Sequence, residues 1–125
     1  MTEYVCAGIF VREGGPMQAG EVVARHTHNF DHMTRITRGR FRVRRWNAAA
    51  DEAGNPAFGP EGKPLWLLTD DHEVEAPYRL LIKAACAHEF TALENGSSYE
   101  CLFLPRDPLT HEPVAQWNGW LGATV

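Results

Sequence analysis

The sequence has no long hydrophobic run. Its apolar stretches all fall short of the roughly 20 consecutive residues that cross a bilayer as a helix. The first ten residues, MTEYVCAGIF, have no basic start followed by a long apolar segment, so we expect no signal peptide. The sequence therefore predicts a cytoplasmic protein that does not bind membranes.

Cysteine is scarce. The 125 residues include three, Cys6, Cys86 and Cys101, which are odd in number and widely spaced. A disulfide framework requires paired cysteines in an oxidising compartment. We therefore expect buried thiols in a reducing compartment, in agreement with a cytoplasmic location.

An excess of positive charge is also missing. The formal net charge is −4, which argues against a general nucleic-acid binder. The basic residues nevertheless gather between positions 35 and 45. Every second residue in part of this segment is an arginine: Arg38, Arg40, Arg42 and Arg44. We interpret them as the solvated outer face of a half-buried strand, in preference to an anion-binding ladder or a subunit contact.

Heptads and internal repeats are absent, and short β-rich runs between turn residues take their place. We expect eight strands, at 4–11, 21–28, 32–37, 40–46, 65–69, 78–83, 88–93 and 99–104. The cluster Gly14-Gly15-Pro16 should end the first strand, and the third and fourth strands should pair around Gly39. Many short strands with little helix predict an all-β sandwich or a closed barrel.

The length fits one domain covering residues 1–125. Segment 48–64 is rich in Ala, Gly, Pro and acidic residues, which predicts a long excursion between strands. The tail at 105–125 contains three prolines, and we expect one short helix in it, around 114–117.

Histidine is concentrated in one place, at His26, His28 and His32. Period-two alternation puts four side chains on one face of the strand at 21–28: Val22, Ala24, His26 and His28. A turn at 29–31 can bring His32 back from the next strand, and His88 begins a later strand. Clustered imidazoles inside a barrel are costly to bury unless something satisfies them. Since imidazole is the commonest ligand of transition metals, the cluster predicts a site for one divalent metal ion.

These residues resemble the first motif of the cupin superfamily: G, five residues, HxH, three or four residues, E, six residues and G. Here the motif runs from Gly20 to Gly39, with His32 at the glutamate position. The second motif, G-x5-PxG-x2-H-x3-N, aligns on His88 within 77–92. The sequence departs from this motif at its other four defined positions. Where the motif has Gly, Pro, Gly and Asn, the sequence has Pro77, Lys83, Ala85 and Ala92.

The chain is thus similar to small single-domain cupins. The resemblance implies a double-stranded β-helix (jelly-roll) barrel that pairs as a homodimer. It also implies four metal ligands: His26, His28, His32 and His88. For the dimer contact, we expect a contribution from Trp117 and Trp120, which a short tail cannot bury alone.

Four neutral imidazoles would leave the full charge of the metal uncompensated. Such a site favours an anionic ligand and strengthens the metal as a Lewis acid. Fe(II), Ni, Zn and Cu suit it, Mn suits it less well, and the oxygen-seeking Mg and Ca are not expected. In octahedral geometry two positions stay open for a substrate, or for a substrate atom beside dioxygen.

Strand alternation also predicts which side chains line a small, mainly apolar substrate pocket: Thr34, Ile36, Phe90, Cys101 and Phe103. Each of them also fits an ordinary place in the barrel core. Cys86 could approach the metal or be a plain buried thiol. We leave His72, expected to be exposed in its acidic stretch, and His111 out of the site.

Several cupins with three or four histidine ligands are dioxygenases. The resemblance therefore implies a metal-dependent dioxygenase acting on a small anionic or enolisable substrate, although the sequence indicates no catalytic acid or base. Two alternatives stay open: a non-catalytic module that binds or senses a small molecule or metal, and a metal-dependent isomerase or lyase.

Overall fold

The computed structural model describes residues 2–105, 109–110 and 123–124. These residues form ten strands: β1 (Thr2–Cys6), β2 (Ile9–Met17), β3 (Val22–Thr27), β4 (His32–Arg38), β5 (Arg40–Ala48), β6 (Trp66–Glu75), β7 (Tyr78–Ile82), β8 (Ala87–Ala92), β9 (Ser97–Phe103) and β10 (Ala123–Thr124). The described part of the chain has no helix, and hence none long and apolar enough to cross a membrane.

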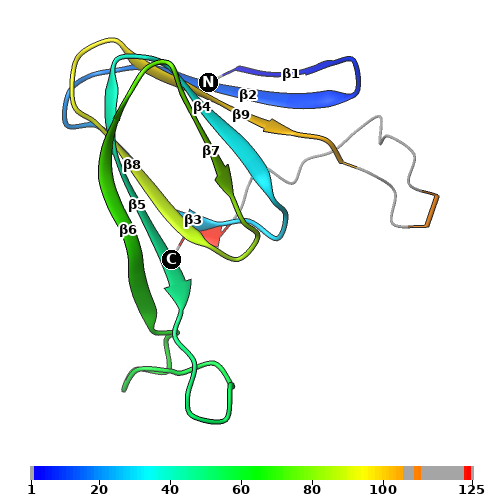
Figure 1. Ribbon diagram of the computed structural model, residues 1–125, viewed down its shortest axis with the longest axis vertical. Helices are drawn as coiled ribbons and strands as arrows, with labels where there is room; N and C mark the ends of the chain where they lie inside the picture. The colour runs from blue at the N-terminus through cyan, green and yellow to red at the C-terminus, as the bar shows by residue number, and fades with distance from the viewer. Residues whose placement is uncertain (1, 106–108, 111–122, 125) are drawn as a thin grey trace.

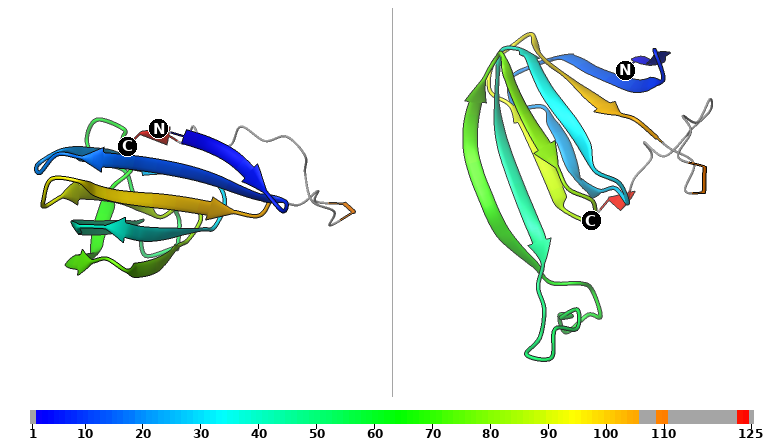
Figure 2. Two further views of the ribbon diagram at one scale, coloured as in Figure 1. Left: turned by 90° about the horizontal axis from the view of Figure 1, so that it is seen from above. Right: turned by 45° about the vertical axis from the view of Figure 1, so that its right-hand side comes forward.

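The strands form two five-stranded antiparallel sheets that face each other (Figure 1). One sheet has the order β1-β2-β9-β4-β7 and the other β10-β3-β8-β5-β6. We call them sheet A and sheet B. Figure 2 shows that the sheets stand close at one end and diverge towards the other. The all-β class predicted from the sequence is confirmed.

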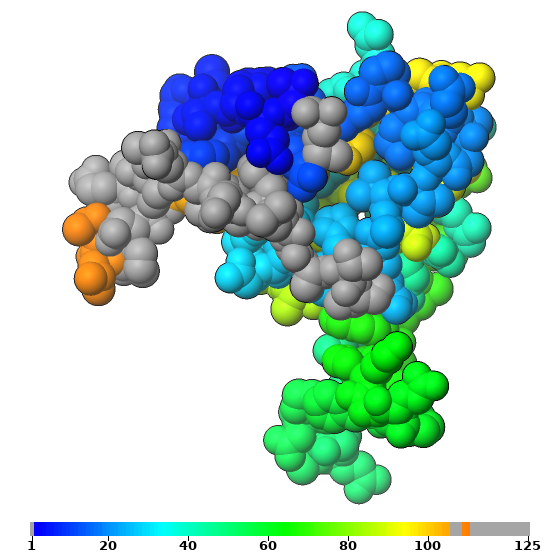
Figure 3. Space-filling view, turned by 180° about the vertical axis from the view of Figure 1, so that it is seen from behind, coloured from blue at the N-terminus to red at the C-terminus, as the bar shows by residue number. Residues whose placement is uncertain are grey.

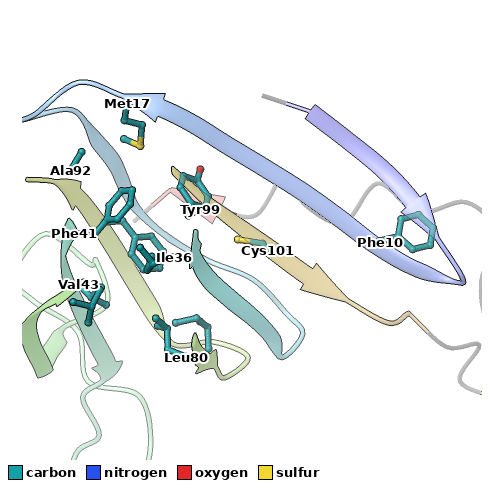
Figure 4. Close-up of a cluster of buried hydrophobic side chains, with 12 residues drawn as sticks. Phe10, Met17, Ile36, Phe41, Val43, Leu80, Ala92, Tyr99 and Cys101 are labelled. Atoms are coloured by element: carbon teal, nitrogen blue, oxygen red, sulfur yellow. The ribbon is translucent and has the colours of Figure 1, made fainter. Parts of the chain in front are cut away.

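The core lies between the sheets, where aromatic rings from both of them meet. Phe41 of β5 is fully buried, and its ring centroid lies 6.4 Å from that of Phe90 and 6.0 Å from that of Tyr99. Figure 4 shows Phe41, Ile36 and Tyr99 together in this space. Burial of large apolar side chains supplies most of the stabilisation of such a fold.

The first predicted strand, at 4–11, is wrong. Ala7 and Gly8 have φ angles of 52° and 78° and form a turn, so β1 and β2 are separate antiparallel strands. The predicted end of this strand at Gly14-Gly15-Pro16 is also wrong, because β2 continues to Met17, with a register shift against β9. A Cβ at Gly14 would lie 2.2 Å from Cζ of Tyr99, so glycine here makes room for a core side chain.

The predicted pairing of strands 32–37 and 40–46 is wrong as well. Gly39 does form the bend, with a φ angle of 74°. However, β4 pairs with β7 and β9, whereas β5 pairs with β6 and β8. The bend at Gly39 therefore carries the chain from sheet A to sheet B.

Strand β3 contains an irregularity that the alternation rule misses. Val23 lies opposite Phe90 and His26 opposite His88, so β3 has one more residue than β8 over this span. Such a bulge turns successive side chains out of simple alternation. As a result Val23 packs against the core while Val22 is 51% exposed, and the predicted common face of Val22 and His26 is wrong.

Predictions for the cysteines, for the excursion at 48–64 and for the tail can also be compared with the structure. Cys86 and Cys101 are buried, but Cys6 is exposed because it lies on the edge strand β1. Residues between β5 and β6 project away from the two sheets (Figure 3). The predicted helix around 114–117, Trp117, Trp120 and His111 lie outside the described residues.

Candidate metal centre

Three histidines on or next to strands of sheet B converge. His26 belongs to β3, His28 to the turn that follows it, and His88 to β8. One ligand atom from each lies within 4.8 Å of the others. The ring centroids of His26 and His88 are 4.1 Å apart, and those of His26 and His28 are 4.9 Å apart. These three side chains could hold one metal ion.

The backbone sets this convergence. His26 and His88 are direct partners across β3 and β8, because the bulge in β3 brings His26 into that register. The turn that carries His28 is fixed from the other side, since the amide of Ala85 donates to the carbonyl of His28 over 2.8 Å. Two loops distant in sequence therefore support one site.

Hydrogen bonds to the backbone select the ligand nitrogen of two of the rings. Nδ1–H of His26 donates to the carbonyl of Ala24 (2.7 Å), and Nδ1–H of His88 donates to that of Cys86 (3.0 Å). In each ring Nε2 is then the atom with an available lone pair. This second contact fixes ring orientation, as it does for most metal-bound histidines.

Burial keeps these rings neutral. Desolvation, followed by the charge of His26, lowers the pKa of His88 to about 3. Desolvation likewise lowers the pKa of His26. Since a metal binds the deprotonated imidazole, these rings are already in the state that a ligand must adopt.

His32 lies beside the three but is not part of the convergent group. Its side chain on β4 is buried, and its ring centroid lies 5.2 Å from His28 and 5.4 Å from His88. Desolvation, and then the charge of His88, lowers its pKa to about 3. A fourth ligand at this position stays a prediction.

The five predicted pocket residues all point between the sheets, but they are closely packed. Ile36, Phe90 and Cys101 belong to the buried apolar cluster, and Thr34 is fully buried with its hydroxyl 3.4 Å from Cys101 Sγ. Phe103 is partly buried against that cluster. Of the five, Phe90 lies next to a histidine, with its ring centroid 5.9 Å from that of His88, and a role of the five in binding substrate stays a prediction.

Phe30 completes an aromatic side of the site that the sequence did not indicate. Its ring centroid lies 4.7 Å from that of His28 and 4.4 Å from that of Phe103. In the sequence Phe30 was only the middle of an expected turn. An apolar wall against the ligands limits water access and lowers the local dielectric constant.

Arg45 and Asp70 are two further residues that the sequence reasoning missed. Arg45 lies opposite His88 on β8 and opposite Asp70 on β6. Together with His26 they form one cross-strand line on the inner face of sheet B, which we call the polar row: His26, His88, Arg45 and Asp70. A signal was available, since Phe41, Val43 and Arg45 share one face by alternation.

His72 and Cys86 lie near this row. His72 is half-buried, and its Nδ1 lies 2.8 Å from Oδ1 of Asp70, so the predicted exposed position is wrong. It is not in the convergent group, nor is Cys86. Desolvation raises the pKa of the Cys86 thiol, which favours the buried-thiol reading.

The outer face of sheet B carries most of the alternating arginines. Arg42 binds Asp71 through two bonds of 2.8 Å, and Arg44 binds Glu89. Arg40 lies 3.8 Å from a carboxylate oxygen of Glu73. These contacts support the interpretation of a solvated, charge-paired face.

Solved structures with a similar arrangement of strands include members of the cupin superfamily. A hydroquinone 1,2-dioxygenase, PnpCD, solved with Cd2+ and 4-hydroxybenzonitrile, matches with a TM-score of 0.56 and 18% identity over 85% of this chain and 63% of its own. KdgF from Halomonas sp. matches with a TM-score of 0.51 and 18% identity over 86% of this chain and 90% of its own. Hydroquinone 1,2-dioxygenase from Sphingomonas sp. TTNP3, with 4-hydroxybenzoate bound, matches with a TM-score of 0.50 and 13% identity over 74% and 56%.

The chain spans less than two thirds of the length of either dioxygenase chain. No protein-family model and no curated protein matches the sequence. At these identities the likeness shows the fold: the chain has the cupin fold that its histidine motif predicts.

Proposed function

We propose that the chain is a metal-dependent dioxygenase that binds one divalent transition metal through His26, His28 and His88 and acts on a small anionic or enolisable substrate. The observation that carries this proposal is the meeting of three histidine nitrogens within 4.8 Å. His32 is the proposed fourth ligand. The structural likeness to two hydroquinone dioxygenases supports the reaction class.

The donor set fits such a metal. Imidazole is a preferred ligand of Fe, Ni, Zn and Cu, and the buried rings are neutral and oriented before any metal binds. A bound Fe(II) ion would supply the electron transfer that activates dioxygen for an organic substrate.

The surrounding side chains would then select and shield the substrate. Phe30 and Phe103 form an aromatic side beside His28. An aromatic or enolic ring suits that surface by stacking or edge contact.

Oxygen uptake tests this proposal. The untagged protein is loaded anaerobically with Fe(II) and mixed with hydroquinone, then with diketones, thiols and phenolic acids. We expect consumption of dioxygen with at least one of these substrate classes, and none with a His26→Ala/His28→Ala variant. A loaded protein that consumes no dioxygen with any class contradicts the dioxygenase proposal and favours an isomerase, a lyase or a sensing module.

A further inference from the structure

The inner face of sheet B carries a charged pair directly beside the histidines. Arg45 of β5 is the cross-strand partner of His88, and such partners have α-carbons about 4.5–5.5 Å apart. On its other side Arg45 pairs with Asp70 of β6. Arg45 therefore lies on the strand next to the one that carries His88 of the candidate metal centre.

A contact between the sheets shows that this side chain points inwards. Nη1–H of Arg45 donates over 3.2 Å to the carbonyl of Leu81, and Leu81 lies on β7 of sheet A. Since Arg45 itself lies in sheet B, its side chain spans the space between the edges of the two sheets. The arginines at alternate positions, such as Arg42, bind acids on the same sheet instead.

Asp70 holds the guanidinium in one orientation. Nε–H of Arg45 donates over 3.0 Å to Oδ2 of Asp70, and Nη2 binds the same oxygen. The other oxygen, Oδ1, is 2.8 Å from Nδ1 of His72. A carboxylate held by a second residue positions its arginine partner more firmly than a single ion pair would.

The bonds of Arg45 leave donors unused. A guanidinium has five N–H groups, and the contacts to Asp70 and Leu81 use one on each nitrogen. One N–H on each terminal nitrogen therefore stays available, and such a pair suits a carboxylate. Both side chains are 28% exposed, so a small ligand can reach them.

A β-bulge lies at this point of the sheet. Arg45 pairs with Asp70, but the next residue, Trp46, pairs with Leu68, so β6 contributes Thr69 as an extra residue. The hydroxyl of Thr69 donates to the carbonyl of Arg45 over 3.2 Å. Bulges are frequent next to active sites because they re-aim a side chain.

We propose that Arg45, oriented by Asp70, binds the carboxylate of the substrate while another oxygen of the same molecule reaches the histidine cluster. The ligand class is a small carboxylate that carries a hydroxyl, phenol or enol group. This inference deepens the proposed function and rests on the metal centre as the second anchor. Arg45 is a binding residue here, and Asp70 is its positioning residue.

A matched pair of phenols tests the inference by binding rather than turnover. 4-Hydroxybenzoate and 4-hydroxybenzonitrile share the phenol and differ in the carboxylate. Calorimetry of the Zn-loaded protein should give about tenfold tighter binding of the carboxylate, the preference expected of one charge-assisted contact. Arg45→Gln should abolish this preference, whereas Arg42→Gln, the matched arginine on the outer face, should keep it.

Chemical modification of the wild-type protein gives a readout that does not depend on the folding of a variant. Phenylglyoxal modifies accessible arginines, and peptide mass mapping locates them. We expect 4-hydroxybenzoate to protect Arg45 but not Arg42, and the nitrile to protect neither. Equal carboxylate preference in wild type and Arg45→Gln, no carboxylate preference in the wild type, or no protection of Arg45 would overturn the inference.

Metal content separates this inference from the proposed function. If mass spectrometry finds no metal after reconstitution, the dioxygenase proposal fails whatever Arg45 binds. Protection of Arg45 by 4-hydroxybenzoate in metal-free protein would then support the carboxylate site alone. If metal is bound and Arg45 has no effect on either readout, the carboxylate site fails and the metal centre stands.

Discussion

Two arginine–aspartate pairs on β5 and β6 face opposite ways. Arg42 and Asp71 form a two-bond ion pair on the outer face, where the arginine side chain is 49% exposed. Arg45 and Asp70 form their pair on the inner face, where the arginine also binds Leu81 of the other sheet. The residue types and the strands are the same, whereas the face and the bonding differ, since Arg42 binds both oxygens of its aspartate and Arg45 binds one.

The contribution of an ion pair to stability depends on how far solvent surrounds it. In water the attraction between Arg42 and Asp71 is screened, so the pair mainly keeps an exposed sheet face soluble. Between the sheets, Arg45 joins the edges β6 and β7 and stands next to the histidine cluster.

Removing the inner side chain next to Arg42 should destabilise the protein most. Phe41→Ala deletes a fully buried ring that contacts Phe90 and Tyr99, and such deletions cost about 3–5 kcal/mol. Urea denaturation measures the free energy of unfolding. Arg42→Ala, one residue along the strand, should leave the urea midpoint nearly unchanged, and equal losses would contradict the assignment of faces.

The inner histidines should make the metal-free protein sensitive to acid. The pKa values of His32 and His88 are about 3 in the folded chain, against about 6.5 in the unfolded chain. Between these values the unfolded state binds more protons, so stability is full above pH 6.5 and falls as the pH drops towards 3. We expect a loss on the order of a few kcal/mol per histidine, measured by urea denaturation at successive pH values.

A His32→Gln variant provides the control for this acid sensitivity. It should lose less stability than the wild type over the same pH range, because one buried titrating ring is gone. A flat stability profile in the metal-free wild type would contradict the burial of these rings.

The two ion pairs should contribute differently to the free energy of unfolding. Arg45→Ala removes bonds to Asp70 and Leu81 from a partly buried position, and we expect a loss of about 1–3 kcal/mol. Arg42→Ala should have no comparable effect. Thermal unfolding of the two variants measures both losses of stability. A smaller loss for Arg45→Ala than for Arg42→Ala would contradict the larger contribution of the inner pair.

The smallest effect concerns an aromatic side chain on the outer face. Trp46 is buried beneath two arginines, with Cζ of Arg25 4.9 Å and Cζ of Arg44 5.3 Å from its ring centroid. A cation over an aromatic ring contributes about 0.5–1 kcal/mol at such positions. A double-mutant cycle with Arg25→Ala and Trp46→Leu should give a coupling of that size, and zero coupling would show that the arginine merely lies nearby.

The histidine motif allowed the fold and the metal centre to be anticipated, because its spacing encodes a strand, a turn and a second strand. Alternation failed where the backbone departs from it. The extra residue in β3 moves Val23 inwards, and no residue type in that segment signals a bulge. Ala7 has a positive φ in the first turn, and an alanine in the sequence does not predict such a conformation.

Arg45 and His72 were missed for a different reason. Both carry polar side chains in strongly charged stretches, where an exposed position is the usual outcome. Alternation with Phe41 and Val43 indicated the inner face for Arg45, whereas His72 is placed there by its cross-strand partner Val43, which is distant in sequence. The cytoplasmic location and the homodimer stay predictions.

Metal binding by His26, His28 and His88 is tested by the metal content of the untagged protein, measured by inductively coupled plasma mass spectrometry. We expect about one equivalent of a divalent transition metal per chain in the wild type and in His72→Ala, a histidine variant outside the cluster. The His26→Ala/His28→Ala variant should bind almost none. No metal in the wild type after reconstitution, or full metal in the double variant, would contradict a metal centre at these histidines.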